Sequence, residues 1–380
     1  MKKVVTVTSS KLEDVDAAIS EINQQIDVES ITLLLLFFST SYNKAALAKA
    51  VQHHFSSILV VGCSTSGEIG LGGYNQHSIT AIAFSASQFQ VSAALYPNIK
   101  QLQLTQWHHK TVELYENHKN NFKIENKKQM FSLLFIDGLS RCEEPFIRVV
   151  SKAMRGVPII GGSAGDDQQF NETYIFNNGK IHINCGVLLL ISTKLPFDIF
   201  KSQHIHATDK RVVVTGAIPE ERVITELNGY PAAEEYARLL GLRSPEQLTD
   251  GMIAKNPVLV VIGNNEYVRS IQSVNKDASM TFYCAIDLGI VLRIAEGGDL
   301  YASLEKSIND IQGNIGDIQT MIIFDCILRR LELLESNQLV EVGALLSRYN
   351  TGGFNTYGEQ VDGLHMNQTC TGIAIGYAND

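Results

Sequence analysis

The chain has 380 residues, of which 45% are hydrophobic and 19% are charged, and its formal net charge is −9. This length allows two or three domains, each with its own core. An acidic chain without a basic stripe argues against a nucleic-acid partner and against an anionic membrane surface, because both need clustered lysine and arginine. The most apolar runs, residues 31–38 and 186–191, are too short to span a bilayer and predict buried strands instead.

The first residues, MKKVVTVTSSKLED, have no sustained apolar stretch and no small-residue cleavage site, so no secretory signal is expected. Six cysteines are scattered singly along the chain: Cys63, Cys142, Cys185, Cys284, Cys326 and Cys370. Without a C-x-x-C pair or a cysteine–histidine cluster, no zinc site is predicted. Reduced thiols in the core of a cytoplasmic protein are expected instead.

In chain order, short apolar runs alternate with amphipathic stretches, which is typical of β-α-β units. The first unit is predicted as strand, helix, strand and two further strands, over residues 31–38, 44–55, 58–61, 78–85 and 90–96. The same order recurs over residues 131–136, 144–154, 157–160, 173–176 and 186–192. A third copy covers residues 321–376 and begins with a strand at 321–324 and a helix at 327–334.

The second strand of each copy leads into a similar glycine-rich loop: GCSTSGE, GGSAGD or GFNTYGE. The matched residues are Gly62 with Gly161 and Gly353, Ser64 with Ser163, Gly67 with Gly165 and Gly358, Thr65 with Thr356, Glu68 with Glu359, and His77 with His365. Because the order of elements and the loop residues agree together, an internal duplication is predicted.

A different region separates the second and third copies. NGYPAAEEYARLLGL predicts a turn and a helix that begins after Pro231 and ends at Gly241. Strands are expected at 257–263, 281–286 and 290–295, followed by an amphipathic helix at 299–311 that Gly313 ends. The predicted fold class is therefore mixed α/β, with repeated β-α-β-loop-β-β units and mixed sheets in two associated domains, residues 1–208 and 209–380.

One pattern points to an enzyme. GGSAG, residues 161–165, fits the G-x-S-x-G pattern of a hydrolase nucleophile elbow, which needs a helix after the serine. The following DDQQFNETYIFNNGK predicts a loop and a hairpin instead. A serine hydrolase that uses Ser163 therefore stays a secondary alternative, and the protein is expected not to be an enzyme. The loop carboxylates, Asp166 among them, are expected to anchor backbone amides.

Histidines are the other chemically informative residues. His204 and His206 alternate along an extended segment near the predicted domain seam at 203–211, and ligand pockets often lie at such seams. A single neutral imidazole can ligate haem iron, so no spacing motif is required. His77 and His365, at the beginnings of strands, are expected to hydrogen-bond the neighbouring loops.

Several segments together resemble the FIST sensory domain, in both its N- and C-terminal parts: GCSTSGEIG, GGSAGDDQQFNETYIFNNGKI, ITELNGYPAAEEYARLLGL and FNTYGEQ…HMNQTCTGIAIG. FKSQHIHATDKRVVVTGA, YVRSIQSVNKD, FYCAID and DCILRRLE look most like the stand-alone bacterial haem proteins that sense nitric oxide (NosP type). This resemblance implies a cytoplasmic sensor with a b-type haem held by a histidine, nitric oxide as its ligand, and a histidine kinase or cyclic-di-GMP enzyme as its partner.

From the resemblance, His204 is the expected iron ligand, followed by His365, with His206 and His77 in reserve. The alternative is a haem-free sensor of a small metabolite such as an amino acid, in which the repeated loops line the pocket. The residues expected to line it are Ser64, Thr65, Glu68, Ser163, Asp166, Thr356, Tyr357, Glu359 and Asn367. Some of the many apolar strands could also pair between subunits, so the sequence does not decide between a monomer and a homo-oligomer.

Overall fold

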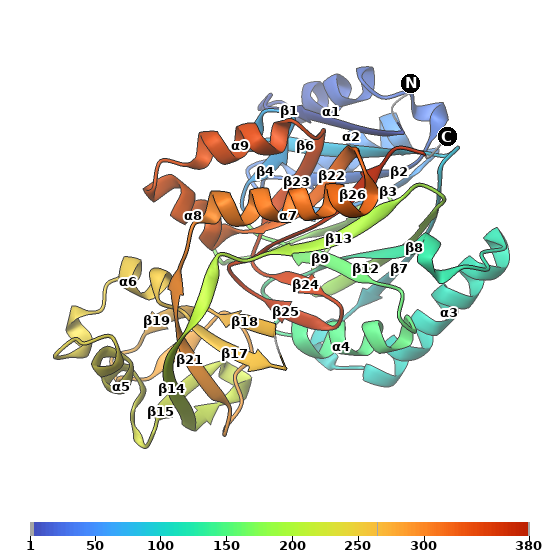
Figure 1. The fold of residues 1–380 in the computed structure, drawn as a ribbon. Helices are drawn as coiled ribbons and strands as arrows, with labels where there is room; N and C mark the ends of the chain where they lie inside the picture. The colour runs from blue at the N-terminus through green and yellow to red at the C-terminus, as the bar shows by residue number, and fades with distance from the viewer. Residues whose placement is uncertain (1–3, 264, 379–380) are drawn as a thin grey trace. The chain divides into compact units, whose positions relative to one another are not determined.

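The computed structural model describes residues 4–263 and 265–378. The helices are α1 Val15–Gln24, α2 Lys44–Phe55, α3 Leu104–Phe122, α4 Glu143–Ala153, α5 Ala232–Leu239, α6 Asp250–Lys255, α7 Leu300–Ile315, α8 Ile327–Glu335 and α9 Leu339–Ser347 (Figure 1). Within these described residues, every helix is too short or too polar to cross a membrane. All six cysteines are buried, as predicted.

Contacts divide the chain into two compact units. Unit 1 consists of the described parts of residues 1–201, 305–365 and 370–380, and unit 2 consists of residues 202–304 and 366–369. This division differs from the predicted domains 1–208 and 209–380, because most of the third copy belongs with the first two. The physical reason is strand pairing: a strand of the third copy pairs with a hairpin of the first.

Unit 1 contains three six-stranded sheets with the same strand order, β1-β6-β2-β3-β10-β11, β7-β12-β8-β9-β24-β25 and β13-β26-β22-β23-β4-β5. The strands of the first sheet are β1 Val5–Ser10, β6 Ile79–Ser85, β2 Ile31–Phe38, β3 Leu59–Ser64, β10 Ile175–Asn177 and β11 Lys180–His182. Those of the second are β7 Phe89–Pro97, β12 Cys185–Thr193, β8 Met130–Ile136, β9 Ile159–Ser163, β24 Glu359–Val361 and β25 Leu364–Met366. Those of the third are β13 Phe197–Ser202, β26 Cys370–Gly376, β22 Ile318–Cys326, β23 Thr351–Thr356, β4 Glu68–Gly70 and β5 Gly73–Asn75.

Each copy donates its hairpin to the sheet of another copy. The hairpin β4–β5 follows β3 in the chain but pairs with β23, and β10–β11 follows β9 but pairs with β3. The hairpin β24–β25 follows β23 but pairs with β9. Every copy therefore gives one hairpin and receives another, in a closed cycle, and Figure 1 shows β4 beside β23 and β24 beside β9.

The strand registers confirm the predicted duplication. Gly62, Gly161 and Gly353 each lie opposite one residue of the neighbouring parallel strand. A Cβ atom at these glycines would lie 1.7, 1.8 and 1.9 Å from the carbonyl oxygen of that residue. Because the two backbones approach so closely, no side chain fits at this position in any of the three copies.

One predicted correspondence is wrong. The alignment that places Glu68 on Glu359 places His77 on Gln368. Both His77 and Gln368 adopt a left-handed φ of 51°. His365 corresponds to Tyr74 instead. The two hairpins have equal lengths, so the chain offers no gap that would bring the two histidines into register.

The three sheets share one core. Phe37, Phe135 and Phe324 occupy the same position in the three copies and are fully buried together with Phe354. Ring centroids lie 5.4 Å apart for Phe37 and Phe135, and 5.9 Å apart for Phe135 and Phe324. Phe354 lies 4.7 Å from Phe37 and 5.6 Å from Phe324. Mostly edge-to-face aromatic contacts therefore join the repeats at their common centre.

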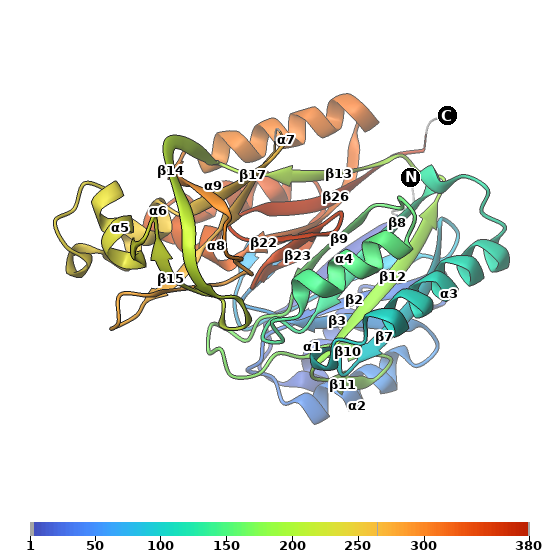
Figure 2. The ribbon, with the colours of Figure 1, turned by 90° about the horizontal axis from the view of Figure 1, so that it is seen from below.

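Helices cover the outer faces of these sheets. Helices α1 and α2 pack together on the first sheet, around Ile22 and Leu47. Helices α3 and α4 lie side by side on the second sheet, around Trp107 and Phe146 (Figure 2). The sequence analysis predicted α2 and α4 but not α3, because the sequence of α3, LTQWHHKTVELYENHKNNF, is largely polar.

Unit 2 is built on one long sheet in the order β18-β17-β21-β14-β15-β20-β19, with β16 paired to β15. Its strands are β14 Ile205–Ile218, β15 Val223–Leu227, β16 Tyr230–Pro231, β17 Val258–Ile262, β18 Asn265–Arg269, β19 Ile271–Val274, β20 Met280–Phe282 and β21 Val291–Gly297. Helix α5 begins after Pro231, and Gly241 follows it with φ 82°, as predicted. Two predictions are corrected: β20 ends at Phe282, and α7 continues past Gly313 to a stop at Gly316, where φ is 77°.

Candidate functional site

The repeated loops meet inside unit 1. The amide of Gly165 donates to the carbonyl of Ser64 at 3.0 Å, and the amide of Asp167 donates to the carbonyl of Thr65 at 3.0 Å. These two bonds hold the second loop against the first. The sequence could not tell whether the repeats share one centre, and these contacts establish that they do.

The third loop is joined to both others. The amide of Ser66 donates to the carbonyl of Asn355 at 3.0 Å, and the amide of Asn355 donates to the carbonyl of Gly67 at 2.7 Å. The amide of Tyr357 donates to the carbonyl of Ser163 at 3.1 Å. We call this meeting point the three-loop centre; of the predicted pocket residues it contains Ser64, Thr65, Glu68, Ser163, Asp166, Thr356, Tyr357 and Glu359, all of them buried.

Two copies place the same threonine–glutamate pair in the three-loop centre. The hydroxyl of Thr65 donates to the carboxylate of Glu68, and the hydroxyl of Thr356 donates to that of Glu359. Glu68 also accepts from the amide and the hydroxyl of Ser78, at 3.1 and 2.6 Å. Burial raises the pKa of the Glu68 carboxyl to about 7, and the hydrogen bonds of Ser78 and Thr65 oppose that rise.

Glu68 should make the stability of the protein depend on pH. Its folded pKa of about 7 exceeds the ordinary value of 4.5, so its stabilising contribution is complete below pH 4.5 and is lost as the pH rises to 7. This difference corresponds to about 3 kcal/mol. We therefore expect urea unfolding of Glu68→Gln to depend less on pH between 5 and 8 than unfolding of the wild type does, and Glu341→Gln, at an exposed glutamate, to behave as wild type. Equal pH dependence in wild type and Glu68→Gln would contradict the assignment.

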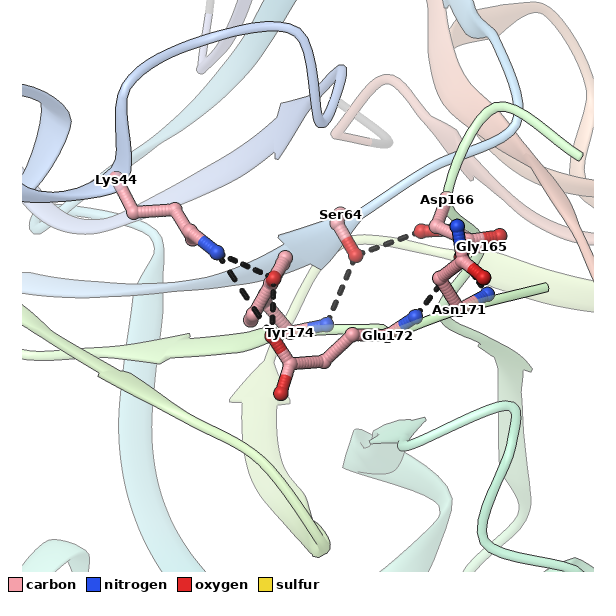
Figure 3. A network of polar contacts seen from close by, with 7 residues as sticks. All are labelled: Lys44, Ser64, Gly165, Asp166, Asn171, Glu172 and Tyr174. Atoms are coloured by element: carbon pink, nitrogen blue, oxygen red, sulfur yellow. Dashed lines mark hydrogen bonds and ion pairs between the residues drawn. The ribbon is translucent and has the colours of Figure 1, made fainter. Parts of the chain in front are cut away.

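Asp166 organises the second loop. Its carboxylate accepts from the amides of Phe170, Asn171 and Glu172, at 2.9, 2.6 and 3.0 Å, and from the hydroxyl of Tyr357. The predicted anchoring of backbone amides is thus confirmed. Figure 3 shows how the network continues: the hydroxyl of Ser64 donates to the carbonyl of Gly165 at 2.6 Å and accepts from the amide of Tyr174 at 2.9 Å.

The anchored loop has a strained backbone. Asp167, Gln168 and Phe170 all adopt left-handed φ values, of 53°, 66° and 53°. Such conformations cost free energy for residues other than glycine and persist where surrounding contacts hold them. The four bonds to Asp166 supply those contacts, and Phe170 stacks on Tyr357 with ring centroids 4.7 Å apart.

Ser163 does not form a nucleophile elbow. It is fully buried at the end of β9, and its hydroxyl accepts from Nε2 of Gln360 at 2.8 Å. Residues 164–174 form turns and bends that lead to β10, where a nucleophile elbow requires a helix. The geometry therefore gives Ser163 the role of a loop contact.

His365 is buried beside the same glutamine. Nε2 of Gln360 lies 3.1 Å from Nδ1 of His365, within hydrogen-bond distance. A haem ligand needs the unprotonated nitrogen for iron and donates its other N–H to a neighbour. In His365 the nitrogen beside such a neighbour is Nδ1, so this residue stays the second candidate for the iron ligand.

The other three candidate histidines differ in burial. His204 is fully buried just before β14 in unit 2, where its carbonyl accepts from the amide of Gly298 at 2.7 Å. His206 is exposed, with Nδ1 3.7 Å from Glu266, and His77 is exposed as well. A haem pocket encloses its axial ligand, so of these three His204 fits best. Asn367, the remaining predicted pocket residue, is buried in the segment of unit 2 at 366–369.

Buried charged side chains that were not predicted lie next to the three-loop centre. Nη1 of Arg330 donates to the carbonyls of Ser66 and Asn75, at 3.4 and 3.0 Å, and to Oδ1 of Asn355 at 3.1 Å. Gly67, with φ 134°, leaves room for this guanidinium, since a Cβ there would lie 1.6 Å from Nη1.

The residue before Arg330, Arg329, forms a buried ion pair. Nε of Arg329 donates to Asp325 at 2.7 Å, both side chains are 0% exposed, and the hydroxyl of Tyr74 also donates to Asp325 at 2.7 Å. The sequence does contain a signal for this ion pair: the aspartate and the arginine in DCILRRLE have i, i+4 spacing, at the junction of a strand and a helix.

Comparison with known proteins places the chain in a family. Residues 32–230 match the FIST N domain and residues 232–362 match the FIST C domain. An uncharacterised protein of Methanocaldococcus jannaschii is 30% identical over 118 residues, which are 31% of this chain and 22% of that protein, so the match spans about a fifth of the length of this relative. A cyanuric acid hydrolase from A. caulinodans superposes with a TM-score of 0.42 at 6% identity, covering 99% of each chain. FIST domains are sensory domains of signal transduction, and their two models together match most of the sequence. The chain belongs to the FIST family, with both its N- and C-terminal domains.

Proposed function

We propose that this FIST protein is a cytoplasmic, haem-based sensor of nitric oxide and that His204 holds the haem iron. The observation that carries the proposal is the full burial of His204, beside the exposure of His206 and His77. A haem held by one imidazole supplies an open axial position for a diatomic gas.

The place of His204 in the chain supports a signalling role. The residue follows the passage of the chain from unit 1 to unit 2 at residues 201–202. It directly precedes β14, which pairs with both β15 and β21 in the sheet of unit 2. A shift of His204 would therefore act on strands in the middle of that sheet. A histidine kinase or a cyclic-di-GMP enzyme would respond if it binds the two states with different affinities.

The test is the absorption spectrum of protein supplied with haem, reduced and then exposed to nitric oxide. We expect a Soret band that shifts with the gas in wild type, in His206→Ala and in His365→Ala, and that is lost or displaced in His204→Ala. His206→Ala is the matched control, because it removes an imidazole two residues away. A gas-sensitive band that persists unchanged in His204→Ala would overturn the assignment.

A second candidate is a haem-free sensor of a small polar metabolite such as an amino acid. The three-loop centre favours it, because Glu68, Asp166 and Glu359 gather carboxylates from all three copies. A ligand amine would find charge-assisted partners there. Thermal stabilisation of haem-free protein by an amino acid, lost in Asp166→Asn, would support this candidate, whereas absence of stabilisation across the amino acids would eliminate it.

Neither candidate requires catalysis. We propose that the protein is not an enzyme, and the burial of Ser163 without a following helix supports this view against the hydrolase alternative.

A further inference from the structure

An open face of the sheet in unit 2 is formed by β14, β21 and β17. The alternating residues Val212, Leu292 and Val258 point to one side and belong to the core of unit 2. Their neighbours in each strand point to the opposite side of the sheet, because side chains alternate along a strand. We call the open part of that opposite side, with Val213, Val291, Val261, Arg211 and Arg293, the valine face.

Three valines form one row across the valine face. Val213 pairs directly with Val291, and the antiparallel pairing of Val260 with Leu292 brings Val261 to the other side of Val291. Their exposed fractions are 37% for Val213, 51% for Val291 and 38% for Val261. β-Branched side chains exposed together on a regular sheet form a contiguous apolar surface, and such surfaces mark interaction sites.

The exposed apolar surface extends beyond the row. Leu288 is exposed in the turn before β21, and the amide of Gly289 in that turn donates to the carbonyl of Val214 at 2.8 Å. Ile262 is exposed at the end of β17. On the same side Leu259, which pairs directly with Arg293, and Ala295 are buried in a second apolar cluster, so the valine face is the part of this side that stays uncovered.

Two arginines flank the valine row. Arg211 pairs directly with Arg293 in the neighbouring cross-strand position. Like charges directly opposite each other destabilise a sheet. Neither guanidinium makes a hydrogen bond or an ion pair with any residue in the described part of the chain. Arg211 and Arg293 therefore make one edge of the valine face cationic, whereas Glu266, which pairs directly with Val261, lies at the β18 end of the valine row.

We propose that the valine face is a docking surface for an acidic amphipathic helix of a partner protein. An apolar sheet face is normally buried against another element, and a helix with one apolar stripe fits a flat row of valines. Carboxylates beside that stripe would pair with Arg211 and Arg293, and arginine binds carboxylates in bidentate geometry. A second copy of this chain fits less well, because a two-fold contact sets a patch against itself and would bring the arginines of both copies together.

This inference is independent of the proposed function. The surface uses neither His204 nor the three-loop centre, so failure of the docking test leaves the haem assignment standing, and loss of the haem assignment leaves the surface standing.

The test is fluorescence anisotropy with a labelled amphipathic peptide that has a leucine stripe flanked by glutamates. We expect saturable binding to the full chain that weakens with added salt, and no comparable binding of the same peptide with lysines in place of the glutamates. Val291→Glu and the double variant Arg211→Glu/Arg293→Glu should each weaken binding about tenfold or more. Because Val291 and Arg211 are exposed and Arg293 is half-buried, circular dichroism and thermal unfolding should show that these variants stay folded.

Val340→Glu is the matched control. Val340 is the most exposed valine, at 84%, and lies on α9 of unit 1, so this variant should bind the peptide as wild type does. Binding of the peptide that Val291→Glu leaves unchanged would overturn the proposal. So would binding of the lysine peptide with equal affinity, concentration-dependent self-association that Val291→Glu abolishes, or binding to phosphatidylserine vesicles in the absence of peptide binding.

Discussion

Replacing Gly62 by alanine should destabilise unit 1 by about 3 kcal/mol or more. The new Cβ would lie 1.7 Å from the carbonyl oxygen of Leu36, and a backbone atom in a paired strand cannot move aside as the end of a side chain can. Relief would require β2 and β3 to separate, and these two strands carry the first sheet. Gly161→Ala and Gly353→Ala should have similar effects, because the same contact recurs at 1.8 and 1.9 Å.

Urea unfolding followed by tryptophan fluorescence would measure this effect. The chain has one tryptophan, Trp107, which is buried in unit 1, so the signal reports on the unit that carries the substitution. Gly313→Ala is the control: it lies within α7, where a Cβ would meet nothing within 4 Å. Alanine there should be neutral or stabilise the helix by up to about 1 kcal/mol. Equal midpoints for Gly62→Ala and Gly313→Ala would refute the role of the close backbone contact.

Replacing Arg329 by methionine should cost about 3–5 kcal/mol, because it leaves the carboxylate of Asp325 buried without its cation. Asp325 and Arg329 are both 0% exposed, and the hydrogen bond from the hydroxyl of Tyr74 would not compensate a charge removed from water. The double variant Asp325→Asn/Arg329→Met removes both charges and should recover part of the loss. The same unfolding measurement checks both expectations.

Comparing the stabilities of these two variants distinguishes the effect of the unpaired buried charge from the effect of lost packing. If the methionine variant and the double variant were equally unstable, lost packing around Arg329 would be the cause. If the double variant is the more stable, the unpaired Asp325 is responsible for the difference.

Local patterns predicted the repeated elements well. The run ITLLLLFF predicted β2 over the residues that form it, and the amphipathic stretch from Lys44 to Phe55 predicted α2 without error. Both elements are specified by their own residues: a continuous apolar run suits a strand buried on both faces, and Asn43 caps the helix by accepting from the amide of Ala46.

Two elements that depend on distant partners were missed. The three-residue strands β4 and β24 were not predicted, whereas the strand expected at residues 173–176 is close to β10. All three lie against a strand of another copy, and nothing within EIG, IFN or EQV predicts that partner. The exchange of hairpins also brings Thr65, Ser163 and Thr356 together in the three-loop centre. The sequence related the three loops by alignment, but it could not show that they meet in space. The misplaced equivalence of His77 and His365 has the same origin: identical residue types were aligned where hairpin geometry decides the register.

The exchange of hairpins also has a consequence for how the chain is made. On the ribosome, β4 and β5 are synthesised well before β23, the strand with which β4 pairs. Until then β3 can receive β10 and β11, but the first hairpin has no sheet to join and the cycle stays open. Non-local pairing of this kind slows folding and leaves strand edges accessible to other nascent chains. We infer that unit 1 completes its fold only after β23 and β24 have been synthesised, and that truncation before β23 would leave the first two copies prone to aggregation.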